Sequence, residues 1–380
     1  MSATAATSLA RAWPTAAEDG DQLAFPAVIM RGGTSRGAFL LARDLPADPA
    51  LRDRVILAAY GSPDVRQIDG LGGATPQTSK VAIIAGSERL DADVDYLFGQ
   101  VAVDRPLVDY GGNCGNLLAA VGPFAVDEGL VAAEEPFTRV AIHNVNTGRV
   151  VLAEVPVVGG RARTVGETRV AGVASPGAPV MLDFAAAAGS LGRGLLPTGE
   201  LREELSGVEV SIVDAANVTV FVAGADIGMT AGDFTGPIDE AILAQMRDLR
   251  AAGAGRLGIE SEGIPKLYAV APAGTRTDAD IAARGLSFGS AHPAYAATVA
   301  ACTAAASRIP GTVVADQLAP GRADAPVLRI GHPAGVIEVE VSVEPGPDGV
   351  PTLRRAALAR TARRLIAGTA FVPRTVLDPA

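Results

Sequence analysis

The amino-acid sequence predicts an α+β protein of two similar domains, each a curled mixed sheet around one central helix. Three observations lead to this prediction. With 380 residues, the chain is too long for one ordinary core. Short β-branched runs separated by turns dominate both halves, and the regular strand–helix alternation of a parallel sheet is missing. In each half, one almost wholly apolar helix begins at a loop of small residues.

The first half starts with a loose tail at residues 1–22 and then contains mostly strands. We expect these strands at 24–30, 37–42, 81–85, 94–103, 139–143 and 150–157, where short β-branched runs end at Gly, Asp, Asn or Pro. A helix is expected at Pro49–Tyr60, before Gly61-Ser-Pro63. A second helix, expected at 116–121, is apolar enough to be buried.

The second half repeats this plan, with strands expected at 208–213, 218–222, 267–270, 327–330 and 336–343. Residues 238–252 have the pattern of an amphipathic surface helix. Residues 293–308 predict another apolar helix, with Pro293 in its first turn. A segment rich in Gly, Pro and Ala at 161–203 indicates the boundary, so the domains are expected at 23–184 and 185–380.

Composition excludes several classes of protein. The net charge is −10 and no Lys/Arg-rich cluster occurs, which argues against nucleic acid and anionic membranes as partners. No apolar run approaches the ~18–20 residues of a membrane helix, and the first residues lack the pattern of a signal peptide. Two cysteines and three scattered histidines form neither a disulfide framework nor a zinc motif. We therefore expect a cytoplasmic protein that needs no metal and no cofactor.

Only two lysines, Lys80 and Lys266, occur beside thirty arginines. Arg stays protonated at any biological pH, whereas a desolvated Lys can become neutral and act as a base. Lys80 ends a glycine-rich loop after Thr78 and Ser79, and the residue order differs from that of a phosphate-binding loop. The loop suits a base that removes a proton from carbon. Lys266 is expected at an exposed strand start.

Cys114 lies in the loop Gly111-Gly-Asn-Cys-Gly-Asn116, at the predicted start of the first apolar helix. Backbone amides at a helix start stabilise a thiolate or a bound anion. The small polar neighbours favour an exposed thiol over a core cysteine. Cys302, inside the second apolar helix, is expected in the core.

The segment Arg31-Gly-Gly-Thr-Ser-Arg-Gly37 combines close-approach glycines with two guanidinium groups, a combination that favours carboxylate binding. Among the histidines, His292 could contact a substrate or cap a helix, and these alternatives stay open. His332 could be structural or lie at the rim of a site, and His143 is expected to be satisfied locally.

Several motifs together resemble the PrpF-like family, in order over about residues 24–373. These motifs are Met30-Arg-Gly-Gly-Thr-Ser-Arg-Gly37, Asp69-Gly-Leu-Gly-Gly73 with Thr78-Ser-Lys-Val81, Gly112-Asn-Cys-Gly-Asn116, Val121-Gly-Pro-Phe124, Ile142-His-Asn-Val-Asn-Thr-Gly148, Gly331-His-Pro-Ala-Gly335 and Arg360-Thr-Ala-Arg-Arg364. The family includes 2-methylaconitate cis–trans isomerase, 4-oxalomesaconate tautomerase and 3-methylitaconate Δ-isomerase. Its fold, that of diaminopimelate epimerase, agrees with the repeat described above.

The resemblance implies that Lys80 abstracts a proton from the carbon vinylogous to a carboxylate. Lys80 or Cys114 then returns a proton at the other end of the allyl system. The residues expected to contact a small anionic unsaturated polycarboxylate are Thr34, Ser35, Arg36, Thr78, Ser79, Asn113, Gly115, Asn116, Ser290 and His292.

Two departures from the family pattern bear on the mechanism. Arg36 stands where many members have Lys, and Ser290 and His292 occur at the helix start where the epimerases have a second catalytic Cys. The resemblance therefore implies a one-sided lysine mechanism rather than two-thiol racemisation. It implies an isomerase of propionate or aromatic-acid breakdown. The alternatives are a keto–enol tautomerase and a non-catalytic accessory protein of an iron–sulfur aconitase-like dehydratase. The oligomeric state stays open, a homodimer being one alternative.

Overall fold

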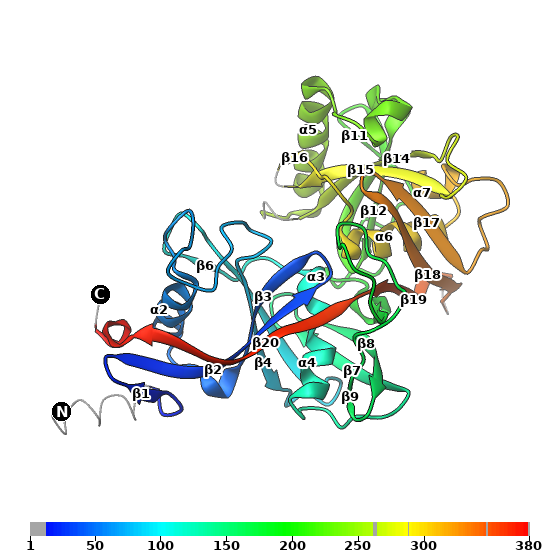
Figure 1. Ribbon diagram of the computed structural model, residues 1–380. Helices are drawn as coiled ribbons and strands as arrows, with labels where there is room; N and C mark the ends of the chain where they lie inside the picture. Colours follow the sequence, from blue (N-terminus) through cyan, green and yellow to red (C-terminus); the bar gives the residue numbers. More distant parts are fainter. Residues whose placement is uncertain (1–12, 261–263, 288, 347–348, 379–380) are drawn as a thin grey trace. The chain divides into compact units, whose positions relative to one another are not determined.

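The computed structural model describes residues 13–260, 264–287, 289–346 and 349–378 (Figure 1). The chain divides into two compact units. Unit 1 comprises residues 1–180 and 360–380, and unit 2 comprises residues 181–359.

Unit 1 is a mixed sheet with helices on both faces. Strand β2 (Gln22–Gly32) is antiparallel to β3 (Ser35–Leu41), and β3 is parallel to β4 (Lys80–Gly86). Strand β4 is antiparallel to β5 (Val94–Val101), which is parallel to β7 (Phe137–Asn144). Strand β7 is antiparallel to β8 (Arg149–Val158). One face of this sheet packs on helix α2, and the other packs on the α3–α4 segment.

Capping residues at both ends determine where helix α2 (Pro49–Tyr60) begins and ends. The Asp48 carboxylate accepts a hydrogen bond from the amide of Leu51 at 2.8 Å, and Gly61 ends the helix with φ 67°. Leu51, Val55 and Ile56 are buried against the sheet. The helix therefore has the boundaries that the sequence predicts.

The central helix of unit 1 has two parts, α3 (Gly115–Leu118) and α4 (Val121–Asp127). Residues 117–126 are all buried, as expected for the apolar run. Phe124 packs on Phe39 of β3 with ring centroids 5.6 Å apart, and α4 also contacts β4, β7 and β8. The sheet thus curls round this segment, as the sequence predicts, although the helix is interrupted and reaches Asp127.

Unit 2 repeats the order and the strand directions of unit 1. Its antiparallel pair β12 (Val208–Ala215) and β13 (Asn217–Ala223) is followed by helix α5 (Glu240–Leu257). Strand β14 (Lys266–Pro272) is parallel to β13 and antiparallel to β15 (Ile281–Ser287). Helix α6 (Ala297–Ser307), buried at every position, precedes β17 (Val327–His332) and β18 (Gly335–Pro345). Strand β17 is parallel to β15 and antiparallel to β18, so the predicted structural repeat is confirmed.

The remaining elements are short or lie at the edges. They are β1 (Ala17–Asp19), η1 (Ala42–Asp44), β6 (Val108–Asp109), β9 (Arg161–Ala162), β10 (Val180–Asp183), η2 (Ala185–Ala187), β11 (Glu203–Leu205), η3 (Gly224–Ile227), η4 (Ala231–Phe234), β16 (Ser290–Ala291), α7 (Val313–Asp316), β19 (Pro351–Arg360), β20 (Ala362–Pro373) and η5 (Arg374–Leu377).

The two ends of the chain differ from the sequence prediction. Residues 362–373, expected in the second domain and without a predicted strand, form β20, which pairs antiparallel with β2 over its whole length and belongs to unit 1. Part of the tail expected at 1–22 is also packed, because Trp13 is fully buried and contacts Phe25, and β1 pairs with β2. Segments from both halves of the sequence, around Trp13 and at 362–373, therefore pack in unit 1.

The start of helix α6 also differs from the prediction. The helix begins at Ala297 with Ala296 as its N-cap, so Pro293 lies before it and not in its first turn. A separate short strand, β16, occupies residues expected to lead directly into the helix.

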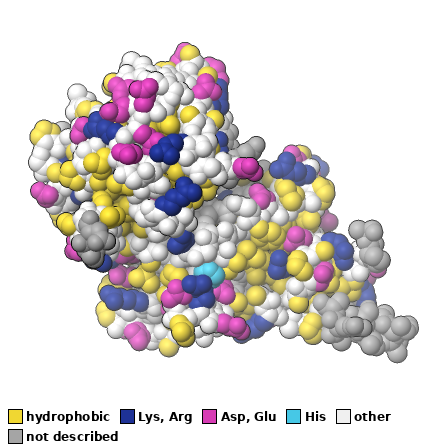
Figure 2. Space-filling model, turned by 180° about the vertical axis from the view of Figure 1, so that it is seen from behind, with side chains coloured by type: hydrophobic (Ala, Val, Ile, Leu, Met, Phe, Trp, Pro, Cys, Tyr) yellow, Lys and Arg dark blue, Asp and Glu magenta, His cyan; other side chains and the backbone are white. Residues whose placement is uncertain are grey.

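On the face drawn in Figure 2, arginine and carboxylate side chains are interspersed rather than gathered by sign. Ion pairs such as Arg202–Glu209 and Arg354–Glu344 connect neighbouring strands or loops. Within the described residues, no helix is both long and apolar enough to cross a membrane.

The pairing of β20 with β2 predicts different costs for two substitutions on one strand. Val372 is fully buried and Ile366 is 64% exposed. We expect Val372→Ala to lower the free energy of unfolding by about 2 kcal/mol and Ile366→Ala to change it by less than about 0.5 kcal/mol. The fluorescence of Trp13, the only tryptophan, reports urea unfolding of unit 1. Equal effects of the two changes would show that this part of β20 is not packed.

Candidate functional site

Lys80 opens strand β4, between Gly37 of β3 and Gln100 of β5. Its Nζ donates a hydrogen bond to Gln100 Oε1 at 2.6 Å and lies 5.0 Å from the centre of the Phe98 ring. Gln100 Nε2 donates to the carbonyl oxygens of Ser79 at 2.8 Å and Pro76 at 3.1 Å. These bonds fix the amide so that its oxygen faces the lysine, and the amine is held in one place.

The backbone at Lys80 is equally constrained. A Cβ added at Gly37 would lie 2.0 Å from the Lys80 carbonyl oxygen, so only glycine fits there. The Tyr60 hydroxyl donates to the same carbonyl oxygen and accepts from the amide of Ala38 at 2.9 Å. Burial raises the pKa of the Tyr60 phenol, which therefore remains a donor.

Cys114 is the N-cap residue of α3. Its Sγ accepts a hydrogen bond from the amide of Leu117 at 3.4 Å, and the thiol donates to Ser35 Oγ at 3.8 Å. The side chain is only 8% exposed and thus buried, contrary to the expectation of an exposed thiol, because its sulfur faces the Leu117 amide and the Ser35 hydroxyl. The sulfur therefore caps the first turn of α3, and its proton is directed at the Ser35 hydroxyl.

Lys80 and Cys114 lie on the same face of the sheet. Ser35, which contacts Cys114, is two residues before Gly37, the partner of Lys80, and alternate residues of a strand share a face. From the ordinary spacing along and between strands, the Cα atoms of Ser35 and Lys80 are about 8 Å apart. The amine and the thiol that the sequence selects are therefore carried on one face of the unit 1 sheet.

The turn between β2 and β3 packs on the start of α3. A Cβ at Gly33, which has φ 49°, would lie 2.2 Å from Asn116 Oδ1. The amide of Thr34 is 3.5 Å from the same oxygen. Thr34 and Asn113 are exposed, and Gly115 and Asn116 are half-buried, so these predicted contact residues border Cys114 on the surface of unit 1.

Two asparagines complete this surface. Asn144 Nδ2 donates to Asn113 Oδ1 at 2.7 Å. Asn146 bonds both backbone groups of Phe98 at 2.8 Å, and thereby holds the ring that lies under the lysine amine. Both belong to the motif at 142–148. This motif therefore supports the site by holding Asn113 and Phe98 in position.

The loop before Lys80 is built on a buried glutamine. Gln67, which is 1% exposed, accepts hydrogen bonds from Ser79 Oγ at 2.6 Å and from the amide of Ala74 at 2.8 Å. The Ser79 side chain is fully buried, so it supports the loop and offers nothing to a substrate, contrary to expectation. Thr78 Oγ1, 2.8 Å from Thr75 Oγ1, remains half-buried.

The two arginines of the first glycine-rich segment have different surroundings from those expected. Arg31 Nη1 donates to the carbonyl oxygens of Gly33 at 3.0 Å and Thr361 at 2.8 Å, so this guanidinium ties the turn to the C-terminal segment. Arg36 follows Ser35 and therefore points to the opposite face of β3, where its Nη2 lies beside Gly73. Neither arginine forms an ion pair with a carboxylate within the described part of the chain.

Unit 2 contains the last two predicted contact residues. Ser290 is exposed in β16, and His292 follows it, four residues before the N-cap Ala296. Neither stands at the helix start, contrary to expectation, because Ser290 belongs to β16 and residues 293–295 lie between His292 and the N-cap Ala296. His292 Nδ1 accepts from the amide of Ala294 at 2.9 Å. Burial lowers the pKa of His292, and the positive charges of Lys266 and Arg284 lower it further.

Other candidate residues are structural. Cys302 is buried in α6, and burial raises the pKa of its thiol to about 12, as expected for a core cysteine. His332 is buried and stacks on Tyr295 with ring centres 5.9 Å apart. His143 Nδ1 lies 2.9 Å from Asp95 Oδ1, which confirms that it is satisfied locally.

Sequence reasoning did not find Gln100, Phe98, Gln67, Asn144 or Asn146. Each acts through a neighbour that is distant along the chain. The only sequence signal is the presence of Gln100 in the mostly apolar second half of β5, and its meaning depends on the register of β5 with β4.

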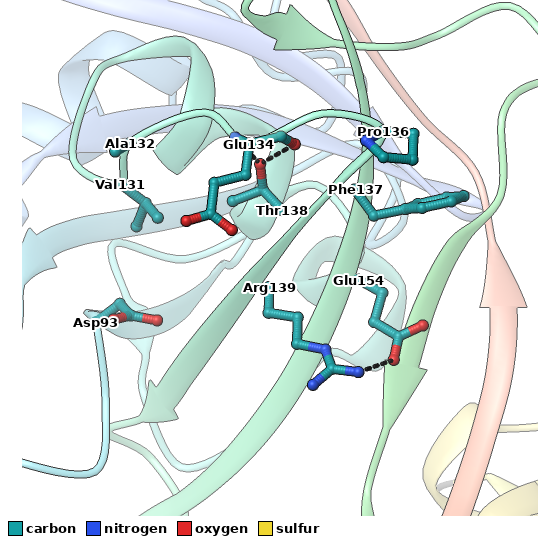
Figure 3. A pocket seen from close by; sticks show the side chains of 9 residues that line it. All are labelled: Asp93, Val131, Ala132, Glu134, Pro136, Phe137, Thr138, Arg139 and Glu154. Atoms are coloured by element: carbon teal, nitrogen blue, oxygen red, sulfur yellow. Dashed lines mark hydrogen bonds and ion pairs between the residues drawn. The ribbon is translucent and has the colours of Figure 1, made fainter.

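A cavity of about 650 Å³ lies elsewhere in unit 1 (Figure 3). It is lined by Asp93, Val131, Ala132, Glu134, Pro136, Phe137, Thr138, Arg139 and Glu154. Figure 3 shows Arg139 pointing toward Glu154. Arg139 Nη2 and Glu154 Oε1 form an ion pair at 3.9 Å, and Glu134 and Asp93 add two further carboxylates to the lining. Neither Lys80 nor Cys114 lines it, so the candidate site is not this cavity.

Comparison with known proteins gives a consistent result. A family model described as "PrpF protein" matches residues 22–373. The chain is 43% identical to the 3-methylitaconate isomerase of Eubacterium barkeri, a match covering 94% of this chain and 99% of that relative. It is 40% identical to the 4-oxalomesaconate tautomerase of Pseudomonas putida over 93% of this chain and 97% of that relative. It is 37% identical to the 2-methyl-aconitate isomerase of Cupriavidus necator over 93% and 98%, respectively.

Solved structures agree. The crystal structure of a methylitaconate-Δ-isomerase, 43% identical, superposes with a TM-score of 0.85 over 95% of this chain and 98% of that chain. A hydroxyproline epimerase from Agrobacterium vitis, only 12% identical, gives a TM-score of 0.54 over 92% and 93%, respectively, which shows a shared fold alone. The predicted α+β, diaminopimelate epimerase-like fold is therefore confirmed.

The two cysteines should differ in reactivity. Cys114 is 8% exposed beside an amide donor, whereas Cys302 is fully buried with a raised pKa. We expect iodoacetamide to alkylate Cys114 of the folded protein at least about 100-fold faster than Cys302. Peptide mass spectrometry of timed samples measures both rates. Equal rates in the folded protein, or faster labelling of Cys302, would contradict the described burial; equal rates in urea are the control.

Proposed function

The chain belongs to the PrpF family, and we propose that it is an isomerase that moves or re-forms a C=C bond in a small unsaturated di- or tricarboxylate. The reaction is a proton transfer at carbon. Its support is the placement of the Lys80 amine and the Cys114 thiol on one face of the unit 1 sheet. With both cysteines free, the protein fits a reducing cytoplasm.

Lys80 is the proposed base. In its neutral form, the amine takes a proton from the carbon vinylogous to a carboxylate, and the electron pair of the C–H bond spreads over the allyl system onto that carboxylate. Its anchor, Gln100 Oε1 at 2.6 Å, sets the direction from which the amine approaches the substrate. General base catalysis of this kind contributes about 10²–10⁴-fold in rate.

The second step returns a proton at the other end of the allyl system. The ammonium of Lys80 can return it and restore the neutral amine. Alternatively, the Cys114 thiol gives its proton, and the resulting ammonium and thiolate recover their starting forms by exchange with water. The Leu117 amide and the Ser35 hydroxyl are the polar groups that lie next to the sulfur in this second route.

The negative charge that develops on the substrate needs hydrogen-bond donors close to the Lys80 amine and the Cys114 thiol. Gly115 and Asn116 are the first residues of α3, and amides at a helix start have no acceptor within the helix. Asn113 and Thr34 add polar groups on the same surface. Donors aimed at developing charge are a large source of rate, since removal of one donor from an oxyanion site costs about 3–4 kcal/mol.

The relatives define the substrates to be tested. They are named for 3-methylitaconate, 4-oxalomesaconate and 2-methyl-aconitate, which are all small unsaturated polycarboxylates. The first named relative, at 43% identity, favours allylic migration of a C=C bond over keto–enol tautomerisation as the main reaction. The purified chain should be mixed with each of the three acids and the ultraviolet absorbance followed. The acid whose absorbance changes fastest shows which of the two reactions predominates.

Deuterium exchange tests the role of Lys80. In D2O, the wild-type chain should introduce deuterium from solvent into its substrate. Loss of the exchanging proton signal in the proton NMR spectrum of the substrate measures the rate. We expect Lys80→Ala and Lys80→Arg to lower this exchange by about 10²–10⁴-fold, because neither offers a neutral amine. Lys80→Arg is the matched control for charge, and unchanged Trp13 fluorescence shows that unit 1 remains folded.

Two outcomes would contradict the proposal in different ways. Exchange that persists in Lys80→Ala would remove Lys80 as the base. Absence of exchange and of isomerisation with all three acids would argue for a binding protein in place of an isomerase.

A further inference from the structure

Tyr96, on β5, carries a buried hydroxyl that has no hydrogen-bond partner. Its side chain is fully buried, and no described group lies within hydrogen-bond geometry of its oxygen. Buried polar groups almost always have a partner, so such an exception calls for an explanation. Tyr60 of the same unit shows the usual arrangement, because its buried hydroxyl both donates and accepts a hydrogen bond.

Tyr96 lies on the face of the sheet that carries the candidate site. Gln100 is paired with Lys80 across β5 and β4, and the Lys80 amine contacts both the Gln100 oxygen and the Phe98 ring. Alternate residues of a strand share a face, so Tyr96 points to this side as well. The Phe98 ring also reaches the cysteine loop, because a Cβ at Gly112 would lie 3.6 Å from its edge.

The strand on the other side of Tyr96 reaches the same loop. Asn144 of β7 is the direct partner of Tyr96 in the parallel pair, and both side chains are buried. Asn144 Nδ2 donates to Asn113 Oδ1 at 2.7 Å, and Asn113 is the residue before Cys114. A tyrosine side chain is longer than that of asparagine. These contacts therefore place the Tyr96 hydroxyl beneath the segment that leads into Cys114.

The electrostatics of the phenol agree with this placement. Burial raises the pKa of Tyr96 well above its ordinary value, and a negative charge on Cys114 raises it further. The phenol therefore keeps its proton and remains a hydrogen-bond donor under conditions in which a thiol loses its own.

Several other titratable groups share this face of strands β2–β8 and β20. With Tyr96 (β5), these groups are Lys80 (β4), Asp109 (β6), Arg149 (β8) and Arg364 (β20). Asp109 is exposed and accepts from the amide of Gly111, and Arg364 is paired with Glu128. The other lysine of the chain, Lys266, is not among them. It opens β14 of unit 2, where it is half-buried rather than exposed, contrary to the expectation from the sequence.

We propose that the Tyr96 hydroxyl is the hydrogen-bond donor that stabilises the thiolate of Cys114. In the thiol form, the proton of Cys114 is directed at Ser35, and the phenol has no acceptor. Loss of that proton ends the bond from the thiol to Ser35 and leaves a sulfur that only accepts, so the phenol gains a partner. Tyr96 acts through Cys114 and is therefore a positioning residue. Its part in turnover rests on the proposed function, because a stabilised thiolate favours the route in which Cys114 returns the proton.

Removal of the phenol oxygen tests this proposal. Tyr96→Phe keeps the ring, and Tyr268→Phe, which changes a similarly buried tyrosine of unit 2, is the matched control. The alkylation rate of Cys114 by iodoacetamide is measured by peptide mass spectrometry across the pH range in which thiols ionise. We expect Tyr96→Phe to move the midpoint of this profile upward by about one pH unit, because the thiolate loses a charge-assisted hydrogen bond. Alkylation near neutral pH then becomes about tenfold slower, and the rate at high pH and the profile of Tyr268→Phe stay unchanged.

Urea unfolding separates this role from a structural one. The Tyr96 hydroxyl forms no bond in the thiol form, so Tyr96→Phe should not lower the midpoint of unfolding followed by Trp13 fluorescence. Tyr60→Phe, which removes two hydrogen bonds, should lower it. An equal loss in both variants would show that the Tyr96 hydroxyl has a structural partner, and would overturn the proposal.

Two alkylation results would also overturn it. One is an unchanged pH profile in Tyr96→Phe. The other is a rate lowered by the same factor at every pH, which would show altered access to the sulfur rather than a lost donor.

A separate measurement keeps this proposal distinct from the proposed function. The probe is tricarballylate, a tricarboxylate that has no C=C bond and cannot be isomerised. If the site binds polycarboxylates, tricarballylate should slow the alkylation of Cys114 in both the wild type and Tyr96→Phe. Absence of protection would count against the proposed function, whereas a shifted pH profile without ligand would still support the bond between Tyr96 and the thiolate.

Discussion

The pairing of Gly37 with Lys80, between parallel strands β3 and β4, is the constraint on which the candidate site depends. Glycine lets the Lys80 carbonyl approach, and the Tyr60 hydroxyl and the Gln100 amide hold that residue from two other sides. The same strand carries Ser35 to the thiol of Cys114. A change of one residue in this register would turn the amine to the opposite face of the sheet, away from the thiol. The positions of the amine and the thiol therefore depend on the sheet and not on a loop.

The glycine-rich segments serve this sheet more than they bind ligands themselves. Gly33 allows the β2–β3 turn to meet Asn116, while the loop before Lys80 closes over Gln67, so its Ser79 hydroxyl is used internally. Arg31 likewise ties the turn to Thr361, which comes from the far end of the chain. The result is a surface in unit 1 that carries Thr34 and Asn113 beside the buried Cys114, on the face of the sheet that also carries Lys80. Unit 2 reuses the same strand order and places its one lysine at the matching position.

Local signals allowed much of the fold to be predicted. Asp48, Pro49 and Gly61 define helix α2, and the apolar run after Cys114 defines the buried central helix. Local patterns do not encode long-range pairing, so they predict neither the pairing of β20 with β2 nor the burial of Trp13. In the site, Lys80 and Cys114 stood out by residue type, because few side chains can perform their chemistry. Their supports did not, because Gln100, Gln67 and Asn146 act across strands whose register no local pattern encodes. Successive side chains of a strand point to opposite faces of the sheet, so Arg36 and Ser35 lie on different faces. For the same reason, only alternate residues of a motif that lies on a strand can contact one ligand.

The central claim is that the amine at position 80 and the thiol at position 114 both reach the carbon skeleton of one bound polycarboxylate. A crystal structure of the wild-type chain with tricarballylate tests this most directly. The account predicts Lys80 Nζ and Cys114 Sγ within about 3–4 Å of neighbouring carbon atoms of the ligand, the separation at which a proton can pass. A ligand bound with either group pointing away from its carbon chain, or bound only by Lys80 through a carboxylate, would contradict it.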